Sequence, residues 1–233
     1  MSTTADTAAD TGTNATDTAT TGTAARTDSA ARTDSGLPRG HVRTPKALAW
    51  LHVIGAFIGL VASTTLTVEK FELAENSDYI PSCTFGTAFT CSSVMESPQA
   101  AAFGIPNPLL GIAGFAAVMA IGVIMLTGAA LPRWFRTAFL IGLGLATIFI
   151  HWLAYEAVYD IYALCIYCMV VWVVTIAMFW FELLRQLSDA ATTQGPGSGV
   201  ARVHSALHML RYPILIAWLF VFAAIIVIEF NFI

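Results

Sequence analysis

The chain alternates between long apolar stretches and short polar connections, after a polar segment at its N-terminus. Five stretches are mostly apolar, and the length of each is close to the roughly 20 residues that a helix needs to cross a bilayer. We predict one membrane-spanning helix in each of them: Ala47–Val68, Pro108–Thr127, Phe135–Tyr155, Ile161–Phe181 and Pro213–Phe230. The pattern therefore predicts an all-α membrane protein with five transmembrane helices.

Residues 1–45 differ from the rest, because Thr, Ala, Asp, Ser and Gly predominate there and large apolar residues are nearly absent. Such a segment cannot bury enough apolar surface to offset the entropy lost on ordering, so we expect a disordered tail. The tail lacks the basic and apolar regions of a cleaved signal peptide, and the first span should therefore act as an uncleaved anchor. Residues 46–233 then form one transmembrane domain, with a flexible linker at Gly195–Gly199 before the last span.

Composition and charge agree with this interpretation, since 57% of the residues are hydrophobic and only 11% are charged. The net charge is −4, and basic residues form only short clusters beside the spans, so nothing indicates nucleic-acid binding. Of the eleven Lys and Arg residues, only Lys70 lies on the side of the membrane that holds the loop between the first two spans. Basic residues accumulate in cytoplasmic loops, which predicts a cytoplasmic N-terminus and an extracytoplasmic C-terminus.

The four cysteines form two pairs, which the predicted topology puts together on the extracytoplasmic side. Cys83 and Cys91 lie in the loop after the first span, and Cys165 and Cys168 form a C-x-x-C motif at the outer end of the fourth. Disulfides persist outside the cytoplasm. Four cysteines allow three pairings, and the spacing favours Cys83–Cys91 and Cys165–Cys168, with exchange between the pairs.

The C-x-x-C motif suits reversible redox chemistry if it lies at the start of a helix. Residues three apart on a helix have Cα atoms about 4.5–5.5 Å apart, within the separation that a disulfide tolerates. A helix N-terminus also carries partial positive charge, which favours a thiolate over a thiol. We therefore expect Cys165 and Cys168 to open and close a disulfide without refolding of the chain.

The loop between the first two spans is the longest connection between spans, and we predict secondary structure within it. Its second part, Ser92–Phe103, is amphipathic and too short to span, so we expect a short helix along the membrane interface. The Gly and Pro residues of Gly104–Pro108 then force a turn, and Pro108 suits the first turn of the second span.

Three motifs in this order resemble the bacterial branch of the vitamin K epoxide reductase family: Cys83–Ser93 (CTFGTAFTCSS), Phe103–Gly111 (FGIPNPLLG) and Cys165–Cys168 (CIYC). The resemblance covers roughly residues 47–185. It implies a four-helix bundle around a quinone, a peripheral fifth helix, and an extracytoplasmic cap formed by the loop and its short helix. Many bacterial members carry a thioredoxin domain after a fifth span. This chain ends at Ile233, so we expect a separate thioredoxin-fold partner of the DsbA type.

The resemblance also implies a role for each cysteine, carried over by position. Cys83 is expected to form the mixed disulfide with the incoming carrier protein. Cys91 is then expected to attack Cys165, and Cys168 is the thiol that faces the quinone. Exchange of this kind needs a thiolate that attacks a disulfide sulfur, and a mobile loop can deliver one.

Two further residues are expected to bind the quinone, which is menaquinone or ubiquinone. Asn107 matches the family's asparagine at the start of the second span, which hydrogen-bonds a quinone carbonyl. Trp172 stands where the vitamin K-recycling members have a tyrosine, four residues past the second motif cysteine, and its indole N–H is also a donor. Residues four apart share a helix face, so Trp172 and Cys168 should point the same way.

Other interpretations of the cysteines remain. One is that the chain is a non-enzymatic membrane protein in which the four cysteines form two structural disulfides. A zinc site is disfavoured, because nothing resembles paired zinc knuckles and one pair lies at a helix head. A quinone-linked oxidase of the DsbB type does the same work on a four-span bundle, but its C-x-x-C precedes the widely spaced pair, and here the order is reversed.

A transporter or channel would need ionisable residues within its spans, and the span centres are almost free of them. His151, near the outer end of the third span, is either a proton donor to a reduced quinone or, as we favour, a hydrogen-bonded interfacial histidine. We conclude that the sequence predicts a monomeric oxidoreductase of the bacterial inner membrane. It would oxidise a thioredoxin-fold carrier, reduce a membrane quinone, and so support disulfide formation in exported proteins.

Overall fold

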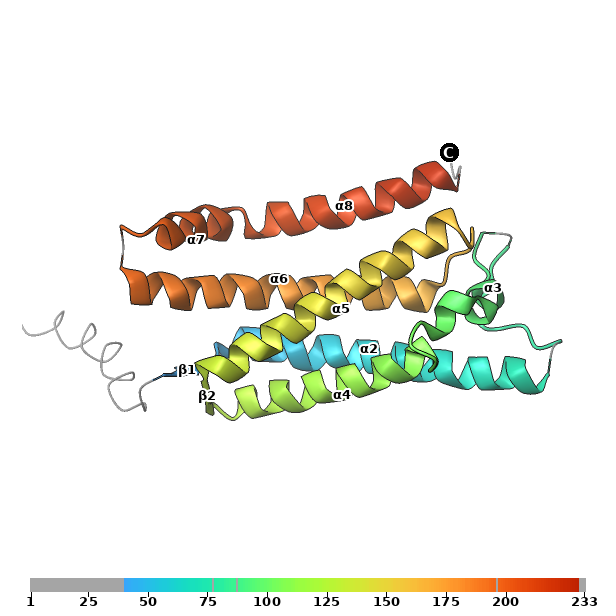
Figure 1. Cartoon of the computed structure of the whole chain (residues 1–233), viewed down its shortest axis with the longest axis horizontal. Coiled ribbons are helices and arrows are strands. Elements are labelled where there is room, and N and C mark those ends of the chain that lie inside the picture. Colours follow the sequence, from blue (N-terminus) through green and yellow to red (C-terminus); the bar gives the residue numbers. More distant parts are fainter. Residues whose placement is uncertain (1–39, 77, 87, 196, 231–233) are drawn as a thin grey trace, which may run out of the picture. The chain divides into compact units, whose positions relative to one another are not determined.

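Five helices that are long and apolar enough to cross a membrane lie side by side in the computed structural model (Figure 1). The structure describes residues 40–76, 78–86, 88–195 and 197–230. Within these residues the five spans are α2 (Lys46–Glu75), α4 (Asn107–Leu126), α5 (Arg133–Tyr159), α6 (Ile166–Gln194) and α8 (Arg211–Glu229). The predicted all-α membrane fold with five spans is confirmed.

Prolines define where three of the spans begin. Pro45, Pro106 and Pro132 each occupy the position immediately before α2, α4 and α5. A proline has φ fixed near the helical value and lacks an N–H group, so it fits the start of a helix and not its interior. Pro108 lies in the first turn of α4, as the sequence predicted.

Helices α2, α4, α5 and α6 form the bundle, and α8 lies outside it, packed against α6 and joined to α5 by the His151–Trp218 contact (Figure 1). The closest packing is between α2 and α4, and α2 also packs against α6, which in turn packs against α5. The buried core between these helices includes Ala56, Phe115, Leu143 and Met178. A four-helix bundle with a peripheral fifth helix is therefore present.

The connection between α2 and α4 folds over one end of the bundle, where Figure 1 shows α3. It contains α3 (Cys91–Glu96) and a 3₁₀ turn, η1 (Pro98–Ala101). We call residues 91–102 the cap. The prediction of a short helix within this connection is confirmed, although it is split in two at Ser97.

The opposite end of the bundle contains elements that the sequence did not predict. Strands β1 (His41–Arg43) and β2 (Ala130–Pro132) pair in antiparallel fashion, so residues 41–43 of the predicted tail form a strand. Residues 1–39 of that tail lie outside the described residues. Helix α7 (Gly199–Met209) follows the predicted glycine-rich linker. These elements depend on partners distant in sequence or on an exposed polar surface, and neither leaves a membrane-type hydropathy signal.

A buried ion-pair cluster joins α5 to α6 at that same end. Arg136 is 2% exposed, and its guanidinium lies 2.6 Å from Glu182 and 3.0 Å from Asp189. His52 of α2 lies beside them, with its Nε2 atom 3.9 Å from Glu182. Removing one partner of a buried pair costs about 3–5 kcal/mol, because the other charge is left buried and uncompensated. The cluster therefore holds three spans in register far from the cysteines.

Candidate active site

The two cysteine pairs meet beneath the cap. Cys83 and Cys91 form a disulfide with a Cα–Cα separation of 5.8 Å, and Cys165 and Cys168 are free thiols. The Sγ atoms of Cys83, Cys91 and Cys165 all lie within 4.8 Å of one another, and all three residues are buried. Cys91 and Cys165 are 74 residues apart in the sequence. In space, the loop pair and the C-x-x-C pair are close enough for thiol–disulfide exchange after a small movement.

Cys165 is the N-cap residue of α6 and not a residue of its first turn. The sequence predicted that both motif cysteines lie on the helix, so this position is a correction. The helix begins at Ile166 and not at the predicted Ile161, because residues 160–165 make a separate connection, in which Tyr162 has a φ of 53°. The expected N-terminal position of the motif is nevertheless present.

The position of Cys165 at the N-cap of α6 changes the chemistry of its thiol. The S–H group of Cys168 donates a hydrogen bond to Cys165 and lowers the pKa of that thiol, and the backbone N–H groups of Cys168 and Tyr167 act in the same direction. Burial opposes this effect but is weaker. Cys165 is therefore the cysteine with the greater tendency to be a thiolate, which is the reactive form in exchange.

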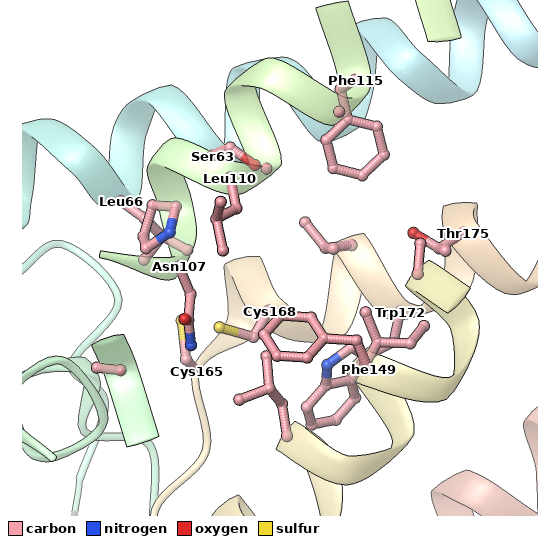
Figure 2. Close-up of a pocket in the computed structure, with 18 of the residues that line it drawn as sticks. Ser63, Leu66, Asn107, Leu110, Phe115, Phe149, Cys165, Cys168, Trp172 and Thr175 are labelled. Carbon is pink, nitrogen blue, oxygen red and sulfur yellow. The ribbon is translucent and has the colours of Figure 1, made fainter. Parts of the chain in front are cut away.

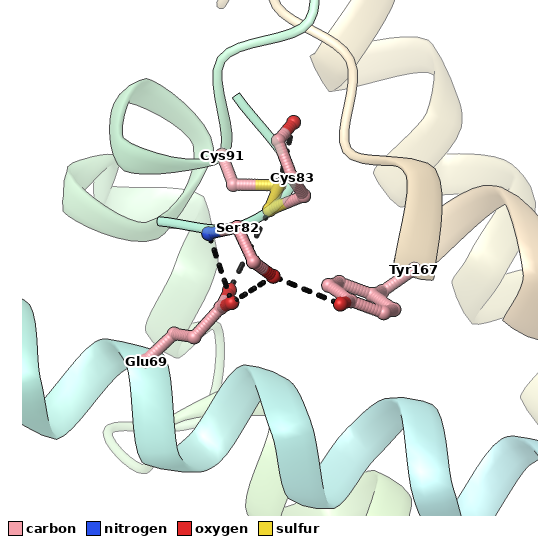
Figure 3. The surroundings of a disulfide bond; sticks show 5 residues. All are labelled: Glu69, Ser82, Cys83, Cys91 and Tyr167. Carbon is pink, nitrogen blue, oxygen red and sulfur yellow. Dashed lines mark hydrogen bonds between the residues drawn. A yellow bond between two sulfur atoms is a disulfide. The ribbon is translucent and has the colours of Figure 1, made fainter. Parts of the chain in front are cut away.

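Two hydrogen bonds hold the loop disulfide against the start of α6. The N–H of Leu164 donates to the carbonyl of Ala88 at 2.9 Å. The hydroxyls of Ser82 and Tyr167 are 2.9 Å apart and hydrogen-bonded, as Figure 3 shows. Tyr167 lies between the two motif cysteines, so this contact ties the residue preceding Cys83 directly to the C-x-x-C segment.

A cavity of about 570 Å³ lies inside the bundle next to the free thiols. Its walls come from α2, α4, α5, α6 and the cap, and they are predominantly apolar. Figure 2 shows Asn107, Cys165 and Cys168 gathered at one end of it, with Phe115 and Thr175 farther along. Both motif cysteines line the cavity, and neither loop cysteine does.

Asn107 and Trp172, the two residues expected to bind a quinone, also line this cavity. The Asn107 side chain is partly engaged, because its Nδ2 donates to the Gln99 carbonyl at 2.8 Å and its Oδ1 accepts from the N–H of Ala102. Asn107 therefore ties the cap to the start of α4. A carboxamide nitrogen carries two hydrogens, so one N–H remains for a ligand.

Trp172 is almost fully buried, with 5% of its surface exposed, and its ring packs edge-on against Phe222 of α8 at 5.5 Å. The fifth helix thus backs the side chain that forms part of the cavity wall.

The cap is latched to three helices around the mouth of the cavity. Lys70 of α2 donates to the carbonyl of Met95 at 3.0 Å. Gln99 donates to Asp160 at 2.7 Å and to Glu156 at 3.2 Å, both at the end of α5. Together with the contacts that Asn107 of α4 makes to Gln99 and Ala102, these bonds hold the cap at the end of the cavity where the thiols lie.

The sequence analysis missed Glu69, Lys70 and Gln99 as site residues. Glu69 and Lys70 lie just beyond the predicted end of the first span, but α2 continues to Glu75 and carries both beneath the loop. The segment from Glu69 to Glu75 is rich in Glu, Lys, Leu and Ala, which are good helix formers, and this signal favours a longer helix.

His151 faces away from the cavity and is not a wall residue. Its Nδ1 donates to the Thr147 carbonyl at 2.7 Å, and its Nε2 accepts a hydrogen bond from the indole N–H of Trp218 at 3.0 Å. These two partners occupy both ring nitrogens of a neutral imidazole. The histidine fastens α8 to α5, in agreement with the structural interpretation favoured from the sequence.

The cavity suits a quinone in both size and polarity. Its volume lies within the range of about 300–1,000 Å³ that is typical of small-molecule sites, and an apolar wall with few polar groups suits a carbonyl-bearing ring on an apolar tail. Donors are available in the second Asn107 N–H and the Trp172 indole. The buried Gln99 Oε1 has no hydrogen-bond partner among the described residues, so it is available to accept a hydrogen bond from a ligand in the cavity.

Comparison with known proteins adds one positive finding. The sequence profile of the vitamin K epoxide reductase family matches residues 50–183, which is more than half of the chain. The matched region runs from the start of α2 into α6 and contains all four cysteines, Asn107 and Trp172. A comparison with individual curated proteins found no match.

Proposed function

The chain belongs to the vitamin K epoxide reductase family, and from this premise we propose that it oxidises an extracytoplasmic thiol carrier and passes the electrons to a membrane quinone. Family membership and the five spans make the chain a multi-pass membrane oxidoreductase. The use of a quinone, the identity of the carrier and the roles of the cysteines are the content of the proposal.

One observation carries the proposal. The thiol of Cys165 lies within 4.8 Å of both sulfurs of the loop disulfide, and Cys165 and Cys168 also line the cavity. A pair of structural disulfides has no need of such an arrangement. A relay needs it, because the C-x-x-C pair must face the loop on one side and the electron acceptor on the other.

The relay begins at the loop. A carrier thiolate attacks Cys83 Sγ, the Cys83–Cys91 bond breaks, and Cys91 leaves as a thiolate. The second carrier thiol resolves the mixed disulfide, so the carrier is oxidised and the loop is left as a dithiol. Cys91 then attacks Cys165 of an oxidised C-x-x-C pair, and resolution by Cys83 restores the loop disulfide and leaves Cys165 and Cys168 reduced.

The state in the structure, with the loop oxidised and the C-x-x-C pair reduced, is the one that follows this transfer. Cys165 and Cys168 lose two electrons and two protons as they close their own disulfide. A bound quinone supplies the acceptor for both electrons and both protons. With a quinone in the cavity, Asn107 and Trp172 would donate hydrogen bonds that orient the ring and favour the charge that develops on its oxygens.

Access of the carrier requires the loop to move. Cys83 is 1% exposed and Cys91 is fully buried, so a protein cannot reach either sulfur in this conformation. The hydrogen bonds from Leu164 to Ala88 and between Ser82 and Tyr167 must break when the loop swings outward. The closed loop serves internal exchange, and the open loop serves exchange with a separate thioredoxin-fold protein of the DsbA type.

Cysteine variants test the relay. Cys168→Ser and Cys165→Ser should abolish quinone reduction, while Cys83→Ser should block reduction by a protein carrier and spare reduction by a small dithiol that reaches the C-x-x-C pair directly. Quinone reduction is followed spectroscopically in purified protein with either reductant. If Cys83→Ser and Cys91→Ser both retained carrier-driven turnover, the loop disulfide would be structural and the relay would be wrong.

The proposal extends to the cell. Residues 46–233 form the catalytic domain in the bacterial inner membrane, the N-terminal segment before α2 lies on the cytoplasmic side, and a monomer is sufficient because one chain supplies every group named above. Ten of the eleven basic residues fall on the side of the predicted topology away from the cysteines, and this distribution supports a cytoplasmic N-terminus.

A further inference from the structure

Glu69 is a buried carboxylate in contact with the loop disulfide. It lies near the outer end of α2, and only 4% of its surface is exposed. Ionisable groups in or beside a span are costly to bury, so a buried one calls for a functional explanation. Glu69 takes no part in the relay described above.

The two oxygens of Glu69 have different surroundings, as Figure 3 shows. Oε1 accepts hydrogen bonds from both the N–H group and the hydroxyl of Ser82. Oε2 points to Cys83, with 3.6 Å between this oxygen and Sγ. Among the described residues no basic side chain forms an ion pair with Glu69, and the neighbouring Lys70 is engaged with the Met95 carbonyl.

The contact between Glu69 and Cys83 differs between the oxidised and the reduced loop. A disulfide sulfur carries no proton, so in the oxidised state Cys83 gives Oε2 no hydrogen bond. Reduction breaks the sulfur–sulfur bond and adds two electrons and two protons, one proton to each sulfur. The new Cys83 S–H can then donate to the carboxylate oxygen that already faces it, and bonds to charged acceptors are stronger than neutral ones.

We propose that Glu69 makes the Cys83–Cys91 disulfide a stronger oxidant, because its carboxylate gains a hydrogen bond from Cys83 only when the disulfide is reduced. This inference rests on the proposed function for its purpose, since a more oxidising loop draws electrons out of the carrier. Its physical content concerns the loop disulfide alone.

The test measures the redox equilibrium of the loop without quinone or carrier. Full-length protein with Cys165→Ser and Cys168→Ser retains only the loop pair, and it is equilibrated in dithiol–disulfide buffers and then alkylated to count reduced thiols by mass. We expect Glu69→Gln to make the loop about tenfold harder to reduce, at the lower end of what a hydrogen bond to a charged group contributes. Tenfold corresponds to about 30 mV for a two-electron couple.

Glu72→Gln is the matched control, because Glu72 lies on the same helix, is exposed, and carries the same charge. It should leave the equilibrium within twofold of the parent. Glu69→Asp keeps the charge but withdraws it from Cys83, and it should shift the equilibrium in the direction of Glu69→Gln. This variant carries the test if the glutamine variant fails to fold.

Equal equilibria for the parent, Glu69→Gln and Glu69→Asp would overturn the proposal. Equal shifts in Glu69→Gln and Glu72→Gln would also overturn it, because the effect would then come from net charge and not from the contact. Retained carrier-driven turnover in Cys83→Ser and Cys91→Ser would refute the relay, but it would leave the redox equilibrium measured here unaffected, so the two proposals fail separately.

Discussion

Among individual residues, Cys165 lies next to the loop disulfide, lines the cavity, and has a thiol whose pKa is lowered. Because the Cys168 S–H is the leading cause of that lower pKa, Cys168→Ala should raise the pKa of Cys165. The thiolate of the parent persists to lower pH than that of the variant. Ultraviolet absorbance of the thiolate across a pH titration, with the loop disulfide intact, measures the midpoint. A midpoint unchanged or lowered in Cys168→Ala would contradict the assignment.

Asn107 has two tasks at the residue scale, since it holds the cap and offers one N–H to the cavity. Loss of a hydrogen bond to a charge-developing group costs about 1.5–3 kcal/mol, so Asn107→Ala should slow quinone reduction by roughly ten- to a hundred-fold. Exchange between the carrier and Cys83–Cys91 should survive in single-turnover experiments. Trp172→Phe keeps most of the packing and should cost less. Unchanged quinone kinetics in Asn107→Ala would leave only its structural task.

Helices α2 and α4 depend on glycine for their close approach. A Cβ on Gly59 would collide with the ring of Phe115, which lines the cavity, whereas a Cβ on Gly114 would meet nothing within 4 Å. Overpacking a core costs about 1–3 kcal/mol. We expect Gly59→Ala to be less stable than Gly114→Ala by about that amount in thermal unfolding, and to bind quinone more weakly because Phe115 is displaced. Equal stabilities would mean that the helices separate without cost.

For the whole molecule, the decisive property is its orientation in the membrane. Lys70 is the only one of eleven basic residues on the cysteine side, so that side should be extracytoplasmic. After mild reduction, a membrane-impermeant thiol reagent should label Cys83 in intact cells, and Cys83→Ser should remove part of that label. The labelling also depends on loop opening, because Cys83 is buried in the closed state. Labelling only after permeabilisation would reverse the orientation and exclude an extracytoplasmic carrier.

The sequence by itself determined the five spans, their approximate limits and the cap with a short helix. These features follow from local properties, since hydropathy over about 20 residues decides whether a segment spans, and prolines such as Pro106 and Pro132 decide where a helix starts. The motifs around the cysteines were also sufficient to indicate the family, which the profile match confirmed. The cysteine roles and the quinone remain predictions for the experiments above.

Only the tertiary structure decided what surrounds the cysteines. No local pattern indicates that the Cys165 sulfur lies within 4.8 Å of both loop sulfurs, because this distance depends on how the loop packs on α6. Glu69 reads in the sequence as one of several acidic residues beyond a span. It becomes a buried contact of Cys83 because α2 extends beneath the loop and turns this residue, and not the exposed Glu72, toward the disulfide. Helix length and rotation are set by packing across the bundle, and this packing leaves no local pattern in the sequence.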